Sequence, residues 1–509
     1  MLVNAGQTLT ERARLSGRME AIVEVATGAR YDFRQLNDRT NQVANALLAL
    51  GGLNPGDRVA CLMSNRSRYA EGYYACAKTG YVFVALNWRL TVPELSYQLL
   101  DSGAAAVLYD TDQMALVEPL KSQFPHVKWL AADHGDFDAA IAAAPTSEPP
   151  IGASGEDPLY MMYTSGTTGR PKGALVSHRA NLAYMASMLA TSDLGTEERQ
   201  IVVAPMFHIA GLGLTMIAVY RGMTSVILKA FDPVVMWQVV DSERITGFFA
   251  VPSMLAFLYQ HPQRAVSQRK ELRWALCGAA PVPVSLIEAW HAMGVQVRQV
   301  YGATETHGGI CLLTAEHATR KVGSTGLPYF GIDVRVVDLA GNPVPPGMPG
   351  EVITRGPHLF SGYWNQPEAT RAAVRDGWFH TGDIAEVDDE GFVYIKDRAK
   401  DMIISGGENV YPAEIENVLS SHPAVSEVGV IGQPSGKWGE CACAVVVRIG
   451  GWEGDDAQLV EELRTLARTR LARFKQPKSY VFVDTLPRNP SGKILKRVLR
   501  ETFPGPAPE

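Results

Sequence analysis

The sequence predicts an α/β protein with a large N-terminal domain of parallel βαβ sheets, a small β-rich subdomain and a small α+β C-terminal domain. Three observations predict this class. In the first half of the chain, helix-like segments alternate with short apolar runs, as in βαβ units. From about residue 323, closely spaced turn residues separate short strand-like runs. A charged break at 397–401 then precedes about a hundred residues, which is long enough for a separate domain.

The N-terminal elements follow from apolar spacing. Apolar residues recur at helical intervals from Leu36 to Leu48, and Gly51-Gly52 ends that helix. A second helix is expected over 69–79, and apolar runs predict strands over 58–63, 81–86, 105–109 and 159–162. The Ala/Pro-rich piece 138–150 is predicted to be a surface connection.

The later elements are shorter and richer in turns. Strands are expected over 334–338 and 351–354, and beyond the charged break over 428–431 and 442–447. Helices are expected from Pro412 and around Leu459 to Leu471. We therefore expect an N-terminal domain over 1–397, a C-terminal domain over 398–503 and a disordered tail over 504–509.

Composition excludes several classes of function. The 509 residues carry a net charge of -6, which argues against a nucleic-acid partner. No secretory signal or apolar run of transmembrane length is present. Six cysteines in so long a chain indicate reduced thiols and a cytoplasmic location. The oligomeric state stays open, and a dimer is compatible with the sequence.

The most informative segment is 163–173, Tyr-Thr-Ser-Gly-Thr-Thr-Gly-Arg-Pro-Lys-Gly, which follows an apolar strand. Glycines let backbone N–H groups approach an anion, and Lys172 supplies a mobile positive charge. The segment differs from the common mononucleotide loop, because Gly166 and Gly169 are too close and Gly173 replaces the magnesium-binding hydroxyl. It therefore predicts phosphate binding by other machinery.

Three further segments have residues suited to a nucleotide. In 300–306, Val-Tyr-Gly-Ala-Thr-Glu-Thr, a tyrosine ring can lie along a base, Thr304 can reach a phosphate and Glu305 can bind Mg²⁺. In 378–383, Trp-Phe-His-Thr-Gly-Asp, the final carboxylate can accept hydrogen bonds from ribose hydroxyls. Segment 277–281, Cys-Gly-Ala-Ala-Pro, is by itself equally typical of a tight turn.

Together with 397–412 and 486–497, these segments resemble, in order, the motifs of the adenylate-forming enzymes: acyl-CoA synthetases, luciferases and peptide-synthetase adenylation domains. The resemblance implies ATP and Mg²⁺ as cofactors. It implies catalytic roles for Lys493, Thr304, Glu305 and His208, with Thr167 and Glu305 near the metal. The ATP-binding residues that it implies are Thr164, Ser165, Gly166, Thr167, Thr168, Gly169, Lys172, Gly278, Ala279, Ala280, Tyr301, Gly302, Asp383 and Arg398.

The resemblance also implies that the C-terminal domain is mobile. Its hinge would be Lys400, two residues after Arg398, and rotation would bring the loop Ser405-Gly406-Gly407-Glu408 to a coenzyme A channel. Lys493 would bridge the substrate carboxylate and the α-phosphate. As an exposed lysine when the domains part, it would also be a target for a lysine acetyltransferase.

These residues imply an AMP-forming acid–thiol ligase that works through an acyl-adenylate. Coenzyme A is the expected acceptor, and His208 stands where amino-acid-activating relatives have an aspartate. The expected acyl pocket contains no arginine for a second carboxylate, which favours a medium- or long-chain fatty acid, with an aryl or phenylpropenoid acid as the alternative. Its expected residues are Phe207, His208, Ile209, Gly211, Leu212, Phe249, Gly308 and Gly309.

Three other functions are compatible with parts of the sequence. A luciferase shares the motifs but is a specialised branch of the family. A non-catalytic nucleotide-binding protein would not need Lys493, Glu305 and Asp383 together. A phosphate-releasing ATPase would release ADP rather than AMP and pyrophosphate. Peripheral membrane contact suits a fatty substrate, although no basic amphipathic helix supports it.

Overall fold

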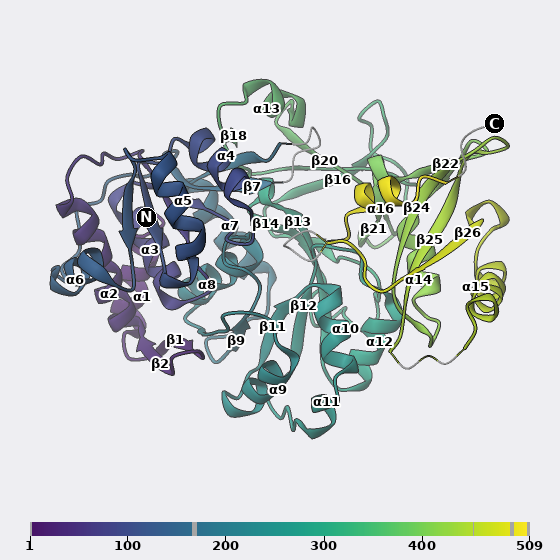
Figure 1. Cartoon of the computed structure of the whole chain (residues 1–509), viewed down its shortest axis with the longest axis horizontal. Coiled ribbons are helices and arrows are strands. Elements are labelled where there is room, and N and C mark those ends of the chain that lie inside the picture. The colour runs from purple at the N-terminus through teal and green to yellow at the C-terminus, as the bar shows by residue number, and fades with distance from the viewer. Residues whose placement is uncertain (1–2, 165–169, 451, 453, 489–492, 506–509) are drawn as a thin grey trace.

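The computed structural model describes residues 3–164, 170–450, 452, 454–488 and 493–505. It has two large sheets in the N-terminal part, a smaller antiparallel sheet and a separate C-terminal sheet. Figure 1 shows the C-terminal part, in yellow-green, at the opposite end of the molecule from the N-terminus. The expected α/β class is therefore confirmed.

The first sheet has nine strands among the described residues. Six of them are parallel neighbours, in the spatial order β13, β12, β11, β9, β10 and β1. Its edges are antiparallel additions. In spatial order the strands are β15 (Leu327–Pro328), β14 (Gly308–Leu312), β13 (Gln296–Ala303), β12 (Trp274–Cys277), β11 (Gly247–Ala250), β9 (Arg199–Val202), β10 (Thr224–Ile227), β1 (Glu20–Glu24) and β2 (Ala29–Asp32).

The second sheet has seven described strands, and its centre is also parallel. At one edge β7 and β8 form an antiparallel pair. In spatial order the strands are β18 (Gly362–Tyr363), β8 (Lys172–Ser177), β7 (Pro158–Thr164), β4 (Val82–Ala85), β3 (Arg58–Leu62), β5 (Ala106–Tyr109) and β6 (Lys128–Ala131).

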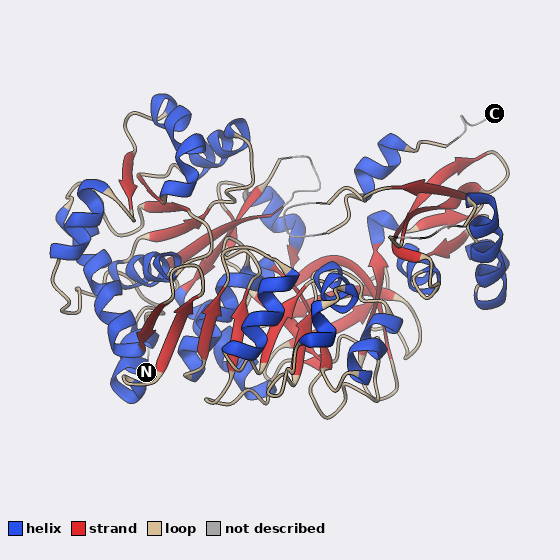
Figure 2. Cartoon of the chain, turned by 60° about the horizontal axis from the view of Figure 1, so that its bottom comes forward, coloured by secondary structure: helices blue, strands red, loops and turns tan. Residues whose placement is uncertain are grey.

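Helices cover these sheets, as parallel strands require (Figure 2). They are α1 (Gln7–Ser16), α2 (Phe33–Ala49), α3 (Ser67–Thr79), α4 (Val92–Ser102), η1 (Thr111–Gln113), α5 (Met114–Gln123), α6 (Gly135–Ala143), α7 (His178–Thr191), α8 (Ile209–Arg221), α9 (Pro233–Ser242), α10 (Pro252–Gln260), α11 (Gln263–Val266), α12 (Val284–Ala292) and η2 (Thr304–Thr306). No helix in the described part of the chain combines the length and apolar composition that crossing a bilayer requires.

One local expectation was wrong in part. The predicted surface connection at 138–150 begins inside helix α6, which buries Phe137 and Ile141 on one face because they are four residues apart. A helix begins at His178, as the residues after the glycine-rich segment suggest. Strand β8 intervenes and returns antiparallel along β7 before α7 begins.

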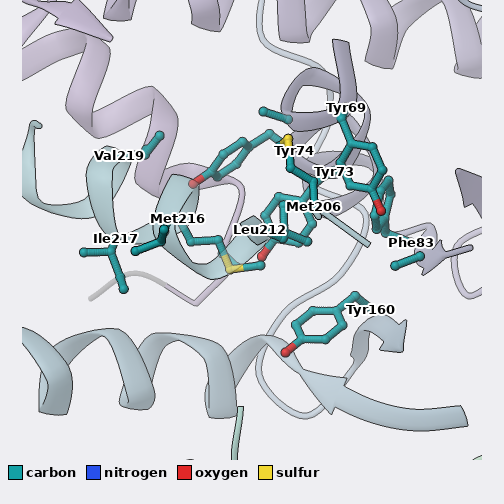
Figure 3. Packing of buried hydrophobic residues seen from close by; sticks show 14 of the residues in the cluster. Tyr69, Tyr73, Tyr74, Phe83, Tyr160, Met206, Leu212, Met216, Ile217 and Val219 are labelled. Carbon is teal, nitrogen blue, oxygen red and sulfur yellow. The ribbon is translucent and has the colours of Figure 1, made fainter. Parts of the chain in front are cut away.

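The core between the two sheets is rich in tyrosine. Tyr69, Tyr73 and Tyr74 of α3 are buried in one cluster with Tyr160 of β7, and Leu212 and Met216 of α8 lie in the same cluster (Figure 3). The rings of Tyr73 and Phe83 pack edge-on, with their centroids 5.7 Å apart. Such rigid aromatic packing stabilises the strand ends that carry the site.

The β-rich subdomain is an antiparallel sheet of β16 (Asp333–Val337), β17 (Gly350–Arg355), β20 (Trp378–Val387), β19 (Val374–Arg375) and β21 (Val393–Arg398), with helix α13 (Pro367–Ala373) beside it. The chain then passes through the short helix η3 (Ala399–Asp401). Strand β21 pairs with β20 and ends at Arg398, so the last N-terminal strand includes the first two residues of the charged break.

The C-terminal unit has apolar clusters of its own. Both Cys441 and Cys443 lie in its strand β25 and are free thiols. The elements are β22 (Ile403–Ser405), β23 (Glu408–Val410), α14 (Pro412–Leu419), β24 (Val425–Ser435), β25 (Gly439–Arg448), α15 (Asp456–Arg470), η4 (Arg473–Lys475), β26 (Ser479–Val483) and α16 (Lys496–Thr502). Of the expected tail, 506–509 lie outside the described residues.

Candidate functional site

A cavity of about 620 Å³ lies between the N-terminal part and the C-terminal unit. Strands β12 and β13 are parallel neighbours, so their carboxyl ends meet at the same sheet edge, where α/β proteins bind ligands. The cavity brings together predicted site residues from five separate segments: Gly278, Ala279, Ala280, Tyr301, Gly302, Asp383, Arg398 and Lys493.

The turn after β12 has a special backbone. Ala279 has φ of +69°, the left-handed region that side chains rarely adopt. At the preceding Gly278, a Cβ atom would lie 2.5 Å from the carbonyl oxygen of Val300. The turn therefore holds its backbone unusually close to β13 and forms one wall of the cavity.

Asp383 is held by two partners. The Tyr301 hydroxyl donates to its Oδ2 at 2.8 Å, and Arg398 Nε lies 3.0 Å from its Oδ1. Asp383 and Arg398 face each other across β20 and β21, which explains the second contact. Each carboxylate oxygen has a second lone pair, so the oriented group can still accept hydrogen bonds from a ligand.

Glu305 lies on η2, directly after β13, and is largely buried. The Tyr363 hydroxyl donates to its Oε1 at 2.8 Å, and Lys172 Nζ lies 4.7 Å from the centroid of the same tyrosine ring. Tyr363 thus links two predicted residues that are distant in the chain. No motif included Tyr363, and no local sequence signal points to it.

The glycine-rich segment joins β7 and β8. Thr164 and Lys172 are paired across this hairpin, and the Thr164 hydroxyl donates to the Lys172 carbonyl at 3.5 Å. The predicted phosphate contacts Ser165, Gly166, Thr167, Thr168 and Gly169 lie outside the described residues. Lys172 starts a strand, unlike the helical lysine of a mononucleotide loop.

One oxygen ligand suits the expected metal. The described residues bring together no group of three His, Cys, Asp or Glu side chains fit for a metal ion. A nucleotide-bound Mg²⁺ needs only one or two carboxylates, because phosphates and waters supply its other ligands. Glu305 fits this requirement, and Thr304 directly precedes it on η2.

Lys493 reaches the cavity from the C-terminal unit. Burial lowers its pKa to about 8, and Arg398 and Lys400 act in the same direction, while Asp383 and Asp401 oppose them. Residues 489–492 of its loop lie outside the described residues. The lysine therefore stands beside Asp383 and Arg398 in the present arrangement of the two domains.

His208 immediately precedes α8 and packs on the ring of Phe207. Burial, with a smaller contribution from Arg89, lowers its pKa to about 4, so the imidazole is neutral at physiological pH. Its Nε2 atom is buried and has no hydrogen-bond partner among the described residues. A neutral ring with an unused nitrogen can donate to or accept from a substrate.

The acyl residues were expected to have no arginine for a second carboxylate, and one arginine lies near Phe207. The Arg89 guanidinium lies 5.0 Å from the ring of Trp88 and 6.0 Å from that of Phe207. It follows β4 by four residues, and only tertiary packing brings it to Phe207. A cation therefore lies beside Phe207.

The other predicted acyl-pocket residues are mostly buried. Ile209, Gly211 and Leu212 begin α8, and Phe249 lies on β11. Gly308 and Gly309 begin β14, and the Tyr184 hydroxyl accepts the Gly309 N–H at 3.0 Å. Neutral His307, whose pKa burial lowers to about 3, lies beside Tyr160 and Asn181.

The predicted coenzyme A loop lies elsewhere in this arrangement. Residues 405–408 form the turn between β22 and β23, and Gly406, Gly407 and Glu408 are exposed. None of the four lines the cavity that contains Lys493. The expected hinge, Lys400, is exposed in η3, which joins β21 to β22.

Replacing Asp383 with alanine is expected to raise the ATP requirement far more than the acid requirement. Losing a charge-assisted contact costs roughly 1.5–3 kcal/mol, or about a tenfold to hundredfold weakening. ATP titration and melting temperature, measured on one preparation, test this. Asp383→Asn, which keeps an acceptor for Tyr301, should fall between alanine and wild type. A lower melting temperature with unchanged ATP dependence would assign Asp383 a structural role only.

Comparisons with known proteins cover almost the whole chain. Residues 9–364 match the model of the AMP-binding enzymes, and 414–493 match that of the AMP-binding enzyme C-terminal domain. A long-chain-fatty-acid–CoA ligase, FadD13 of Mycobacterium tuberculosis, is 42% identical over 99% of this chain and 100% of its own. A feruloyl-CoA synthase of an Amycolatopsis species is 43% identical over 98% of this chain and 99% of its own.

A solved structure agrees with this result. ATP-bound MatB from Rhodopseudomonas palustris is 32% identical, has a TM-score of 0.90 and covers 99% of both chains. The cavity that carries Tyr301, Asp383 and Lys493 is thus set in a fold shared over the full length. The chain belongs to the AMP-binding enzyme family and is an AMP-forming acyl-CoA ligase that uses ATP, Mg²⁺ and coenzyme A.

Proposed function

We propose that this ligase activates a medium- or long-chain fatty acid. The observation that carries the proposal is the apolar character of the side chains that follow β9 or lie on β11, which include Phe207, Leu212 and Phe249. They lie at the sheet edge where β12 and β13 also end. The 42% identical long-chain-fatty-acid–CoA ligase supports the same substrate class.

The residues around the cavity take distinct roles in the first half-reaction. The substrate carboxylate attacks the α-phosphorus of ATP, the bond to pyrophosphate breaks, and an acyl-adenylate forms. Asp383 accepts the ribose hydroxyls, Tyr301 lies along the adenine, and Thr304 contacts the α-phosphate. Lys493 offsets the negative charge that develops between carboxylate and phosphate. Positioning and electrostatics suffice, so the scheme uses no protein nucleophile.

Bound Mg²⁺ supplies positive charge at the phosphates, and Glu305 is the described residue placed to hold it. Tyr363 orients the Glu305 carboxylate through its 2.8 Å hydrogen bond. Thr167, the second proposed hydroxyl near the metal, lies outside the described residues. His208 borders the substrate carboxylate as a neutral group, which avoids fixing the substrate as a tight ion pair.

The second half-reaction uses another arrangement of the domains. The thiol of coenzyme A attacks the acyl carbon of the adenylate, and AMP leaves. Lys400 is the pivot, and rotation brings the loop 405–408 toward the channel that Lys493 leaves. Two features support this: Lys493 lines the cavity, and the exposed loop does not. The ATP-bound relative, with TM-score 0.90 over 99% of both chains, supports the present arrangement as that of adenylation.

An aryl or phenylpropenoid acid is the second candidate. Tyr184 and Tyr329 are both buried next to Gly308-Gly309, and a Cβ on Gly309 would lie 2.4 Å from the Tyr329 hydroxyl. This wall of rigid aromatic rings suits a flat ring better than a long flexible chain. The 43% identical feruloyl-CoA synthase supports this reading.

Pyrophosphate release over a panel of acids separates the candidates. The panel contains octanoate, dodecanoate, palmitate, benzoate, 4-coumarate and ferulate, each with and without coenzyme A. The highest kcat/KM is expected with dodecanoate or palmitate. A preference for 4-coumarate or ferulate would overturn the fatty-acid proposal, and a preference for benzoate would restrict the pocket to a single ring.

Two finer proposals concern the setting of the enzyme. The six free cysteines support a cytoplasmic location. The Lys493 pKa of about 8 leaves part of the amine neutral at pH 7.5, as acylation of a lysine requires. Acetylation by a lysine acetyltransferase, after the domains part, would remove the charge needed for adenylation. Full activity of the acetylated enzyme would contradict this second proposal.

A further inference from the structure

Asp397 is a buried carboxylate that the predicted motifs left without a role. It is the penultimate residue of β21 and pairs with Ile384 of β20, so it belongs to the N-terminal part. Its Oδ2 accepts the N–H of Ala413 at 2.9 Å, in the first turn of α14. It therefore caps a helix of the other domain. The charge also suits the partial positive charge of a helix N-terminus.

Lys496, three residues after Lys493, faces the same carboxylate. Lys496 Nζ lies 3.7 Å from Asp397 Oδ2 and 2.9 Å from Glu416 Oε1. All three side chains are at most 15% exposed. Burial by itself lowers the pKa of Lys496, but Glu416 and Asp397 outweigh it and hold the pKa above its ordinary value. The three groups form a buried cluster that joins the domains.

A second ion pair lies one helical turn along α16. Arg500 Nη2 lies 2.9 Å from Asp401 Oδ1, so Lys496 and Arg500 approach 397 and 401, on either side of Lys400. Rotation at Lys400 would leave Asp397 with β20 and carry Asp401 along with α16. The Arg500 pair would survive, while Asp397 would lose both Lys496 and the Ala413 N–H.

We propose that Asp397 is a positioning residue that latches the C-terminal domain in the arrangement for adenylation. Its contact with Lys496 sets the position of the segment 493–496, which begins with Lys493. The latch opens when the domain rotates, so it favours the first half-reaction over the second. The inference rests on the hinge at Lys400 proposed above.

The test measures both half-reactions of Asp397→Asn on one preparation. An unfolded fraction lowers both rates equally and therefore does not change their ratio. Adenylation is measured as acid-dependent ATP–pyrophosphate exchange, and transfer as thioester formation from synthetic acyl-adenylate and coenzyme A. The probe is dodecanoate, or ferulate if the panel favours it. The ratio of adenylation to transfer is expected to fall about tenfold, equivalent to about 1.4 kcal/mol.

Three companion variants sharpen the result. Lys496→Met should lower the ratio similarly, and adding it to Asp397→Asn should lower it little further, because the two act as one pair. Asp397→Glu restores the charge and should recover most of the ratio. Arg500→Gln breaks the pair that survives rotation, so its ratio should stay within about twofold of wild type. A wild-type ratio in Asp397→Asn, or an equal fall in Arg500→Gln, would overturn the latch.

Trypsin cleavage of the hinge needs no carboxylic acid, so it tests the latch independently of the proposed fatty-acid substrate. Trypsin cleaves after Arg398 and Lys400, and cleavage should be at least threefold faster in Asp397→Asn than in wild type with ATP present. Equal cleavage rates would overturn the latch whichever acid is the substrate. Inactivity of the wild type toward both acids would contradict only the substrate proposal.

Discussion

Lys493→Ala is expected to lose adenylation by roughly a hundredfold to a thousandfold, which is the range for removing one preorganised charge stabiliser. Thioester formation from preformed acyl-adenylate should stay within about threefold of wild type. Lys493 lines the cavity with Tyr301 and Asp383 in the present arrangement, and the proposed rotation would carry it away before transfer. The two half-reactions, assayed separately, show the difference.

The matched control for this substitution is Arg497→Ala. Arg497 lies four residues later, is 77% exposed and pairs with Glu501 on the surface of α16. Its removal takes one positive charge from the same segment without changing the cavity, so both half-reactions should persist. Pyrophosphate release by Lys493→Ala near the wild-type rate would remove this lysine from the catalytic site.

The pKa of Lys493 gives the same assignment a pH dependence. A lysine whose pKa is lowered to about 8 is charged below that pH and loses its charge as the pH rises through it. In the free enzyme, kcat/KM for adenylation should therefore decline above about pH 8. Lys493→Arg stays charged across this range and should remove the decline, although its lower absolute rate reflects different geometry.

The contents of the site could be predicted largely because its motifs are local. Tyr301 lies near the end of β13, and Glu305 lies on the short helix η2 that follows directly. The strand β8 could not be separated from the loop before it, because Lys172 and Gly173 also suit a phosphate cradle. Its pairing with β7 became visible only in the structure.

The contacts that orient the site were beyond sequence reasoning, since they join residues far apart in the chain. Tyr363 holds Glu305 across 58 positions, and Asp397 meets Lys496 across 99. Arg89 reaches Phe207 by tertiary packing alone. A single tyrosine or aspartate in a turn-rich segment carries no periodicity or spacing that would single it out. Helix α6 was missed for another reason, because its alanines precede Pro145 and resemble a linker.

Lys400→Pro is expected to separate the two half-reactions in the opposite sense from Lys493→Ala. Proline fixes φ near −65°, which agrees with the short 3₁₀ turn that residues 399–401 adopt here. The enzyme should form acyl-adenylate at a rate within about fivefold of wild type, since proline also restricts Ala399. Thioester formation should fall by about a hundredfold or more, because the pivot can no longer change its backbone angle.

Lys400→Ala is the control that separates backbone from side chain. It removes the same exposed ammonium group but leaves φ free, so both half-reactions should stay close to wild type. Equal loss of both steps in Lys400→Pro would indicate misfolding of the junction rather than a frozen hinge, and a lowered melting temperature would accompany it. Transfer at the wild-type rate in a stable Lys400→Pro enzyme would place the pivot elsewhere. The latch at Asp397 would then lose its mechanical basis, because that carboxylate separates from Lys496 only if the chain turns between residues 397 and 401.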